Sequence, residues 1–164
     1  FLYIFFITSI FSCMLNYDKL KQLRSETGVS FSLCKKALEE TNNDIDAAKK
    51  RLQEWGEKKA ADKADRETSQ GGIFSYVHHN KKIAALLELQ TETDFVSGNA
   101  EFQKLGAELA MQIASVPAES SEEFLKQPYI RDPGKTVDEL IKEAILKFGE
   151  NIRVSRFVRW SLGE

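Results

Sequence analysis

The chain has 164 residues, enough for one medium domain with a small companion. Its 23 Lys and Arg residues against 25 Asp and Glu residues give a net charge of -2, which disfavours direct binding to nucleic acid. The two cysteines, Cys13 and Cys34, are too few for a disulfide framework or a zinc site and fit reducing surroundings.

Residues 1–16 read as an apolar leader, because no charged residue precedes Asp18. The run is short for a membrane span and lacks the basic start of a signal peptide. The end of a targeting segment, a remnant of a gene model and a membrane anchor all remain as interpretations. We favour the first two, exclude these residues from the fold and expect no membrane association.

Residues 17–55 have the pattern of three short helices. The first carries Leu20 and Leu23 and is expected to end at Gly28, since glycine readily adopts the left-handed conformation that stops a helix. The second is expected to begin at Ser30, a good N-cap, and the third at Asp44. The pattern predicts a three-helix module.

Residues 56–72 form the expected connection to a second domain. Acidic and basic residues alternate over residues 57–67 without an apolar stripe, which predicts a solvated helical linker. The Gly71-Gly72 pair then marks the boundary.

The second domain, residues 73–164, opens with a predicted β-hairpin. Residues 73–78 are rich in β-branched and aromatic side chains, and residues 83–91 alternate between apolar and polar. His78 and His79 invite a metal hypothesis, but adjacent strand residues point to opposite faces, so we expect no metal site.

The remainder predicts two longer helices and a closing strand. One helix covers residues 99–114, residues 116–134 form connecting structure with a short helical turn, and a capping box at Thr136 and Glu139 starts the second helix. In the last strand one face is expected to carry Ile152, Val154, Val158, Trp160 and Leu162. Arg156 interrupts it, either through a bulge or because the face is partly open. The fold class is α+β, a small antiparallel sheet of three strands backed by helices.

Residues 91–99 join the best strand pattern to a helix pattern. They place the carboxylate of Asp94 beside the aromatic ring of Phe95 on a loop anchored at both ends. Such a pair suits a wedge for the pocket of another protein. The alternative is that Phe95 folds inward and Asp94 caps the following helix.

The sequence contains no phosphate-binding loop, nucleophile elbow or metal cluster. Glu92 and Asp94 could form an acid–base pair in a small hydrolase, but no histidine partner or pocket-forming cluster accompanies them. We therefore expect a binding protein without a cofactor rather than an enzyme.

Three groups of segments carry a resemblance to a known family: residues 23–28 with 34–38, residues 76–80 with 92–96, and residues 149–152 with 156–159. Together they resemble translation elongation factor Ts, the nucleotide exchange factor of elongation factor Tu, over residues 17–164. The chain is similar to the short type with a single core. The resemblance implies that residues 17–55 adopt a ubiquitin-associated-like fold.

The same resemblance implies a function in protein biosynthesis. A factor of this family binds elongation factor Tu with GDP and promotes GDP release by disturbing the Mg²⁺ and nucleotide site, without catalysing a reaction. The implied contacts with the partner at that site are Thr93, Asp94, Phe95 and Val96. Those of the N-terminal module are Arg24, Thr27, Gly28, Val29, Lys35 and Lys36.

The chain also departs from the family pattern. Thr91 replaces a usual cysteine, Phe31-Ser32 replaces a frequent methionine pair, and residues 116–134 are far shorter than in typical members. Two alternatives remain: a ubiquitin-type adaptor that uses only the three-helix module, or a shortened factor that binds elongation factor Tu without efficient exchange. Homodimers occur among short members and are a further candidate assembly. We expect a mitochondrial matrix or plastid stroma location, with bacterial cytoplasm as the alternative.

Overall fold

The computed structural model describes residues 15–163, and the chain divides into a unit that ends at Trp55 and a unit that begins at Gly56. The expected apolar leader, residues 1–16, lies outside the described residues except for Leu15 and Asn16. Asn16 is the N-cap of the first helix, where its side chain accepts hydrogen bonds from the N–H groups of Asp18 and Lys19.

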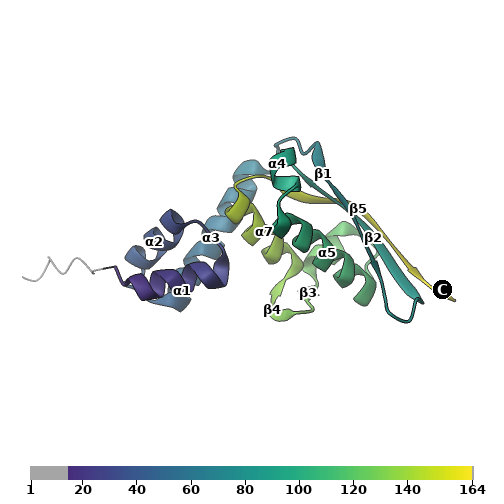
Figure 1. The fold of residues 1–164 in the computed structure, drawn as a ribbon, viewed down its shortest axis with the longest axis horizontal. Helices are drawn as coiled ribbons and strands as arrows, with labels where there is room; N and C mark the ends of the chain where they lie inside the picture. The colour runs from purple at the N-terminus through teal and green to yellow at the C-terminus, as the bar shows by residue number, and fades with distance from the viewer. Residues whose placement is uncertain (1–14, 164) are drawn as a thin grey trace, which may run out of the picture. The chain divides into compact units, whose positions relative to one another are not determined.

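The first unit consists of the three expected helices: α1 (Tyr17–Thr27), α2 (Phe31–Glu40) and the first part of α3 (Ile45–Lys63) (Figure 1). Each helix contributes two or three small or aliphatic side chains to one core, because their apolar positions recur at helical spacing. The buried residues of this unit are Leu20, Leu23, Val29, Cys34, Ala37, Leu38, Ala48 and Leu52.

The expectation that residues 57–67 are a solvated linker is wrong for part of this segment. Helix α3 continues to Lys63, and Ala60 packs against the core of the second unit. The Lys63 side chain is only 11% exposed, and its ammonium lies 3.8 Å from Glu92 Oε1. The end of α3 packs against the core although it has no apolar stripe, because Ala60 and the aliphatic part of the Lys63 side chain supply the buried surface.

The second unit contains the predicted three-stranded antiparallel sheet. Its strands β1 (Gln70–Val77), β2 (Ile83–Thr91) and β5 (Ile152–Ser161) pair in the order β1-β2-β5. Phe74 lies opposite Leu87, and Leu87 lies opposite Phe157, so these side chains share one face.

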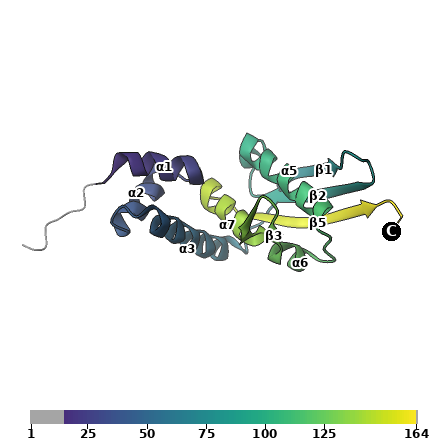
Figure 2. The ribbon, with the colours of Figure 1, turned by 90° about the horizontal axis from the view of Figure 1, so that it is seen from below.

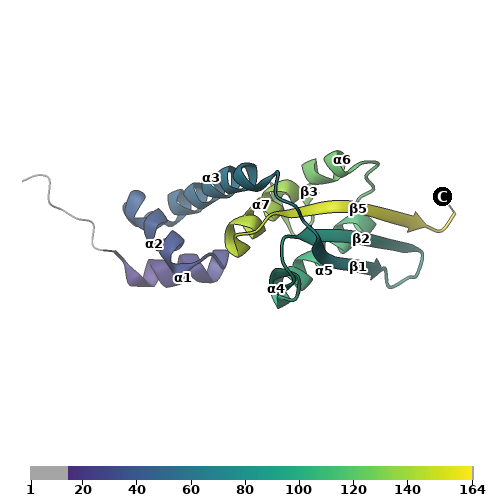
Figure 3. The same ribbon diagram turned by 90° about the horizontal axis from the view of Figure 1, so that it is seen from above.

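Besides the end of α3, the helices of this unit are α4 (Asp94–Ser97), α5 (Ala100–Ser115), α6 (Ser121–Lys126) and α7 (Val137–Phe148). They bury Phe102, Leu109, Phe124 and Ile141 against the inner side chains of the strands. Helix α5 lies in front of β1 and β2 in Figure 2, whereas the strands lie in front when seen from the opposite side in Figure 3. The other face of the sheet is therefore open. The predicted capping box at the start of α7 is confirmed.

The expected apolar face of the closing strand is wrong in its second half. The β2–β5 register shifts between Glu88, which pairs with Arg156, and Leu89, which pairs with Val154. This bulge leaves Ser155 as an extra residue, so it reverses the alternation beyond it. Phe157 consequently faces the helices, while Val158 and Trp160 lie on the open face.

The segment expected to be only connecting structure contains a short β-hairpin of β3 (Pro128–Tyr129) and β4 (Asp132–Thr136). The buried amide of Gln112 on α5 holds it. Its Nε2 donates to the carbonyl of Pro128 at 3.2 Å, and its Oε1 accepts from the N–H of Ile130 at 2.9 Å. The sequence pattern did not predict this pairing, because Pro128, Pro133 and Gly134 are residues that are rare in strands.

Candidate functional site

The candidate site is the exposed turn, residues 93–97, which follows the end of β2 and contains α4 (Figure 1). Thr93 is the N-cap of this one-turn helix, and its hydroxyl accepts a hydrogen bond from the Val96 N–H at 3.4 Å. At the other end the Gly98 N–H donates to the carbonyl of Asp94 at 2.9 Å. The turn is thus closed by hydrogen bonds between its own residues: the Thr93 hydroxyl at the first end and the backbone at the second.

Phe95 and Val96 are adjacent in the exposed turn, but one is exposed and the other is buried. Phe95 is 82% exposed, and Asp94 is also exposed, whereas Val96 is 4% exposed and belongs to the core. The alternative in which Phe95 folds inward and Asp94 caps the following helix is therefore wrong: Val96 fills the core position, Thr93 caps α4 and Asn99 caps α5. A large aromatic ring exposed on an anchored turn is available to a partner.

Glu150, between α7 and β5, fastens the exposed turn to the end of the sheet. Its Oε1 accepts from Thr93 Oγ1 at 2.6 Å, and its Oε2 accepts from the Thr93 N–H at 3.0 Å and from Thr91 Oγ1 at 3.0 Å. One carboxylate therefore satisfies three donors from the segment that carries Phe95.

Glu92 makes the reciprocal connection. Its Oε1 accepts from the N–H of Asn151 at 2.6 Å, and Arg66 Nη1 lies 3.3 Å from its Oε2. Burial raises the pKa of Glu92, but the Asn151 N–H, Arg66 and Lys63 outweigh that effect and hold the pKa below its ordinary value. Glu92 is a structural anion in this geometry, which removes half of the acid–base pair that the hydrolase hypothesis needs.

In the N-terminal module the sequence-predicted residues Thr27, Gly28 and Val29 form the α1–α2 connection. Gly28 has φ 65°, a left-handed conformation that a residue with a side chain rarely adopts, and its N–H donates to the carbonyl of Arg24 at 2.8 Å. Thr27 Oγ1 donates to the Leu23 carbonyl at 2.7 Å. Val29 is 4% exposed, so its side chain fixes the connection from inside rather than facing solvent.

The basic residues predicted for this module lie on its surface. Arg24, Lys35 and Lys36 are all exposed. Lys35 is 3.7 Å from Glu39, and Lys36 is 3.9 Å from Glu40 and 5.0 Å from the centre of the Trp55 ring. Exposed pairs of this kind are weak. Lys35 and Lys36 can therefore give up these ion pairs to bind a partner at little cost in free energy.

His78 and His79 lie outside strand β1, so their side chains do not alternate between the faces of the sheet. They follow Val77, the last residue of β1, and their rings lie 4.2 Å apart, so the geometric argument against joint metal binding is wrong. His78 Nδ1 is 3.1 Å from the hydroxyl of Tyr76. Within residues 15–163, however, no group of three or more His, Cys, Asp or Glu side chains could hold a metal ion.

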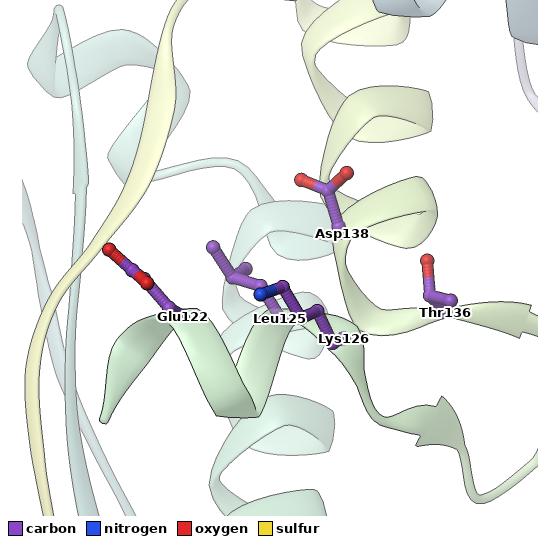
Figure 4. A pocket seen from close by; sticks show the side chains of 5 residues that line it. All are labelled: Glu122, Leu125, Lys126, Thr136 and Asp138. Carbon is purple, nitrogen blue, oxygen red and sulfur yellow. The ribbon is translucent and has the colours of Figure 1, made fainter. Parts of the chain in front are cut away.

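A separate pocket of about 480 Å³ lies between α6 and the β4–α7 junction (Figure 4). None of its lining residues belongs to the exposed turn. Across the described part of the chain, every buried side-chain nitrogen and oxygen has a hydrogen-bond partner. The side chains that line it are Glu122, Leu125, Lys126, Thr136 and Asp138.

Sequence reasoning missed the role of Glu150, although the motif that contains it was recognised. A signal was present: an acidic residue stands directly after the helix-ending Gly149 and two residues before a strand. Its partner segment lies 57 residues away, a pairing that periodicity does not show.

Among residues 15–163, none of the helices has the length and hydrophobicity needed to cross a membrane.

Two family descriptions match the chain. "Elongation factor TS" matches residues 92–164, which include the exposed turn and Glu150, and "Elongation factor Ts, mitochondrial, N-terminal" matches residues 4–61. The second match therefore extends into the expected leader.

Curated relatives agree with these matches. Elongation factor Ts of Thermosipho melanesiensis is 40% identical over 196 residues, which cover 92% of this chain and 100% of the relative. That of Coprothermobacter proteolyticus is 40% identical over 88% of this chain and 96% of the relative. That of Aquifex aeolicus is 45% identical over 87% of this chain but 51% of the relative. The Thermosipho alignment is longer than this chain, so it contains positions with no counterpart here.

The α+β core with its N-terminal helices, together with the family matches and the curated relatives, defines a translation elongation factor of the nucleotide-exchange class. The chain belongs to the elongation factor Ts family.

Proposed function

We propose that this chain binds elongation factor Tu in its GDP-bound form and speeds GDP release, which returns the GTPase to a form ready for GTP. The observation that carries the proposal is the side chain of Phe95, 82% exposed on a turn that Glu150 and Val96 anchor. Membership of the family supports it.

In the proposed mechanism Phe95 enters the partner beside its nucleotide site, and Asp94 and the neighbouring backbone disturb the Mg²⁺ environment. No bond is made or broken by the factor itself, so it is not an enzyme. The effect is linkage: a partner that prefers the empty GTPase weakens nucleotide binding by the same factor by which nucleotide weakens the partner.

Phe95 alone is too small a source of free energy for this effect. Burying one Phe is worth about 1.5–3 kcal/mol. A ten-thousandfold change in nucleotide affinity needs about 5.5 kcal/mol of differential binding. The complex must therefore include further contacts.

We place one further contact on the N-terminal module. Arg24, Lys35 and Lys36 are exposed cations that suit an acidic surface of the GTPase. Thr27 and Gly28 present the backbone of the α1–α2 connection, while Val29 holds that connection in shape.

We place a second contact on the open face of the sheet. Trp160 is 64% exposed, and a groove of about 340 Å³ lies beside Ile73, Leu86 and Val158. An apolar sheet face of this kind is a docking surface for a protein. Its proposed occupant is a second region of elongation factor Tu. A homodimer is the competing occupant, which sedimentation of the free chain over a range of concentrations distinguishes.

For the compartment we propose the mitochondrial matrix or the plastid stroma, with bacterial cytoplasm as the alternative. The description of the family that matches residues 4–61 names mitochondrial proteins, which supports an organelle, whereas the curated relatives are bacterial. Subcellular fractionation followed by immunodetection of the chain tests this: recovery with organelles supports the proposal, and recovery in another fraction contradicts it.

The decisive experiment measures release of a fluorescent GDP analogue from elongation factor Tu with increasing amounts of the full chain. Wild type is expected to accelerate release in proportion to its concentration, and Phe95→Ala to lose most of the effect. Ile130→Ala serves as the control, because it removes a partly exposed apolar side chain outside all of the proposed contacts.

The competing hypotheses predict different results in this assay. Complex formation without faster release identifies a shortened factor that binds but exchanges poorly. The absence of both a complex and acceleration contradicts the proposal and leaves the ubiquitin-type adaptor, which predicts ubiquitin binding by the N-terminal module.

A further inference from the structure

We propose that Glu150 is a positioning residue for Phe95: its carboxylate holds the exposed turn in the orientation that presents the aromatic ring to the GTPase. The proposal rests on the exchange function proposed above and adds a residue that does not itself touch the nucleotide site.

Thr93 links Glu150 to the rest of the turn. Both of its donors, the N–H and the hydroxyl, bind Glu150 at 3.0 Å and 2.6 Å. The same hydroxyl oxygen accepts from the Val96 N–H, so Glu150 fixes the rotamer of the group that caps α4. Glu150 thus fixes the backbone before Phe95, through the Thr93 N–H, and the backbone after it, through the Thr93 hydroxyl and the Val96 N–H.

The turn needs such an external anchor. Helix α4 has four residues, too few for a helix to be stable in isolation. Because Phe95 is largely exposed, its own side chain contributes few contacts that could hold it. Two anchors lie on the C-terminal side of Phe95: the buried Val96, and the bond from Gln103 Nε2 to the Ser97 carbonyl at 2.7 Å. On the N-terminal side Glu92 holds the residue before the turn through the Asn151 N–H, and Glu150 binds Thr93, the first residue of the turn itself.

Glu150 is itself held on both sides along the chain. Before it, Gly149 ends α7 with φ 77° and donates its N–H to the Ile145 carbonyl. After it, Glu92 binds the Asn151 N–H, and Ile152 pairs with Thr91. Its carboxylate is therefore preorganised, as a group that positions another residue must be.

The test compares Glu150→Gln with wild type in the GDP-release assay on the full chain. Glutamine keeps the size of the side chain but loses the charge and one acceptor oxygen, so exchange at limiting factor concentration should fall about tenfold. The matched control is Glu143→Gln, which removes an exposed carboxylate on α7 that binds Lys135, and it should exchange like wild type.

A purely structural role for Glu150 is separated from positioning by a double-mutant cycle. If Glu150 acts through Phe95, Glu150→Gln causes no further loss in the Phe95→Ala background. An additive loss overturns the proposal, as does wild-type exchange by Glu150→Gln. If Glu150→Gln does not fold, Thr93→Val replaces it, since valine keeps the N–H donor and the side-chain shape but loses the hydroxyl.

Hydrogen exchange on the free chain keeps this inference separate from the proposed function. The Val96 amide should lose about tenfold of its protection in Glu150→Gln, because its acceptor is no longer held. Unchanged protection overturns the positioning role even if wild type is an active exchange factor. Lost protection with no exchange activity in wild type leaves the positioning geometry intact and refutes the exchange function alone.

Discussion

Arg156 Nε donates a 2.6 Å hydrogen bond to Glu88 Oε2 on the open face of the sheet, directly after the bulge residue Ser155. This bond lowers the pKa of Glu88, with a further contribution from the amide of Gln90. The bond joins the first pair of residues after the shift in register. Beyond this pair Phe157 faces the helices and Trp160 faces solvent.

The bulge leads to a prediction on two deletions. Removing Ser155 leaves every other residue of β5 on its present face, so the protein should remain folded with a similar melting temperature. Removing Arg153 instead also abolishes the bulge, but it moves Ser155 inward and Val154 outward. That deletion should cost about 1–2 kcal/mol, measured by thermal unfolding. Equal effects of the two deletions would contradict the register.

The two residues of the exposed turn should separate function from stability. Phe95→Ala removes an exposed ring and should change the free energy of unfolding by less than about 0.5 kcal/mol. Val96→Ala removes a buried side chain of the core and should cost about 2 kcal/mol. Urea unfolding measures both. A large loss in Phe95→Ala would show that the ring packs against the protein.

How far the sequence alone predicts this fold is clear from the strands. The alternation in residues 83–91 predicted β2 with its buried Leu87 and Leu89, because a regular strand shows its faces directly. The same argument failed in β5, since a single extra residue reverses the phase and leaves no mark in composition. Arg156, which broke the apolar stripe, was the one visible sign of it.

The residues of the candidate site likewise include some that the sequence predicted and some that it did not. Its exposed residues, Asp94 and Phe95, were predicted because an aromatic beside a carboxylate in a turn is unusual. The residues that hold the turn in place were not predicted, because Glu150 and Asn151 come near it only through the pairing of β5 with β2. Long-range contacts of this kind follow from topology rather than from local pattern.

We expect the free energy of unfolding to depend on pH through the carboxylate of Glu92. Its pKa in the folded chain lies below the ordinary value of 4.5, so its contribution is present above that pH and is lost as the pH falls through the folded pKa. The stability difference between wild type and Glu92→Gln should shrink when urea unfolding is repeated from about pH 6 to about pH 3. A difference that does not vary with pH would contradict the native bonds to Asn151 and Arg66.

The short β3–β4 hairpin should depend on Gln112. Gln112→Leu leaves the carbonyl of Pro128 and the N–H of Ile130 without their partner and should cost about 1–3 kcal/mol. Gln22→Leu, which changes an exposed amide on α1, is the matched control and should cost less than about 0.5 kcal/mol. Similar losses in the two variants would mean that the buried amide does not hold the hairpin.

The most direct test of the exchange function is a closed thermodynamic cycle with elongation factor Tu. Calorimetry measures the affinity of the full chain for the empty and for the GDP-bound GTPase, and the affinity of GDP with and without the chain. If the chain is an exchange factor, the chain and GDP weaken each other's binding by one and the same factor, and Phe95→Ala reduces this factor. Equal affinity of the chain for the empty and the GDP-bound GTPase would contradict the exchange function.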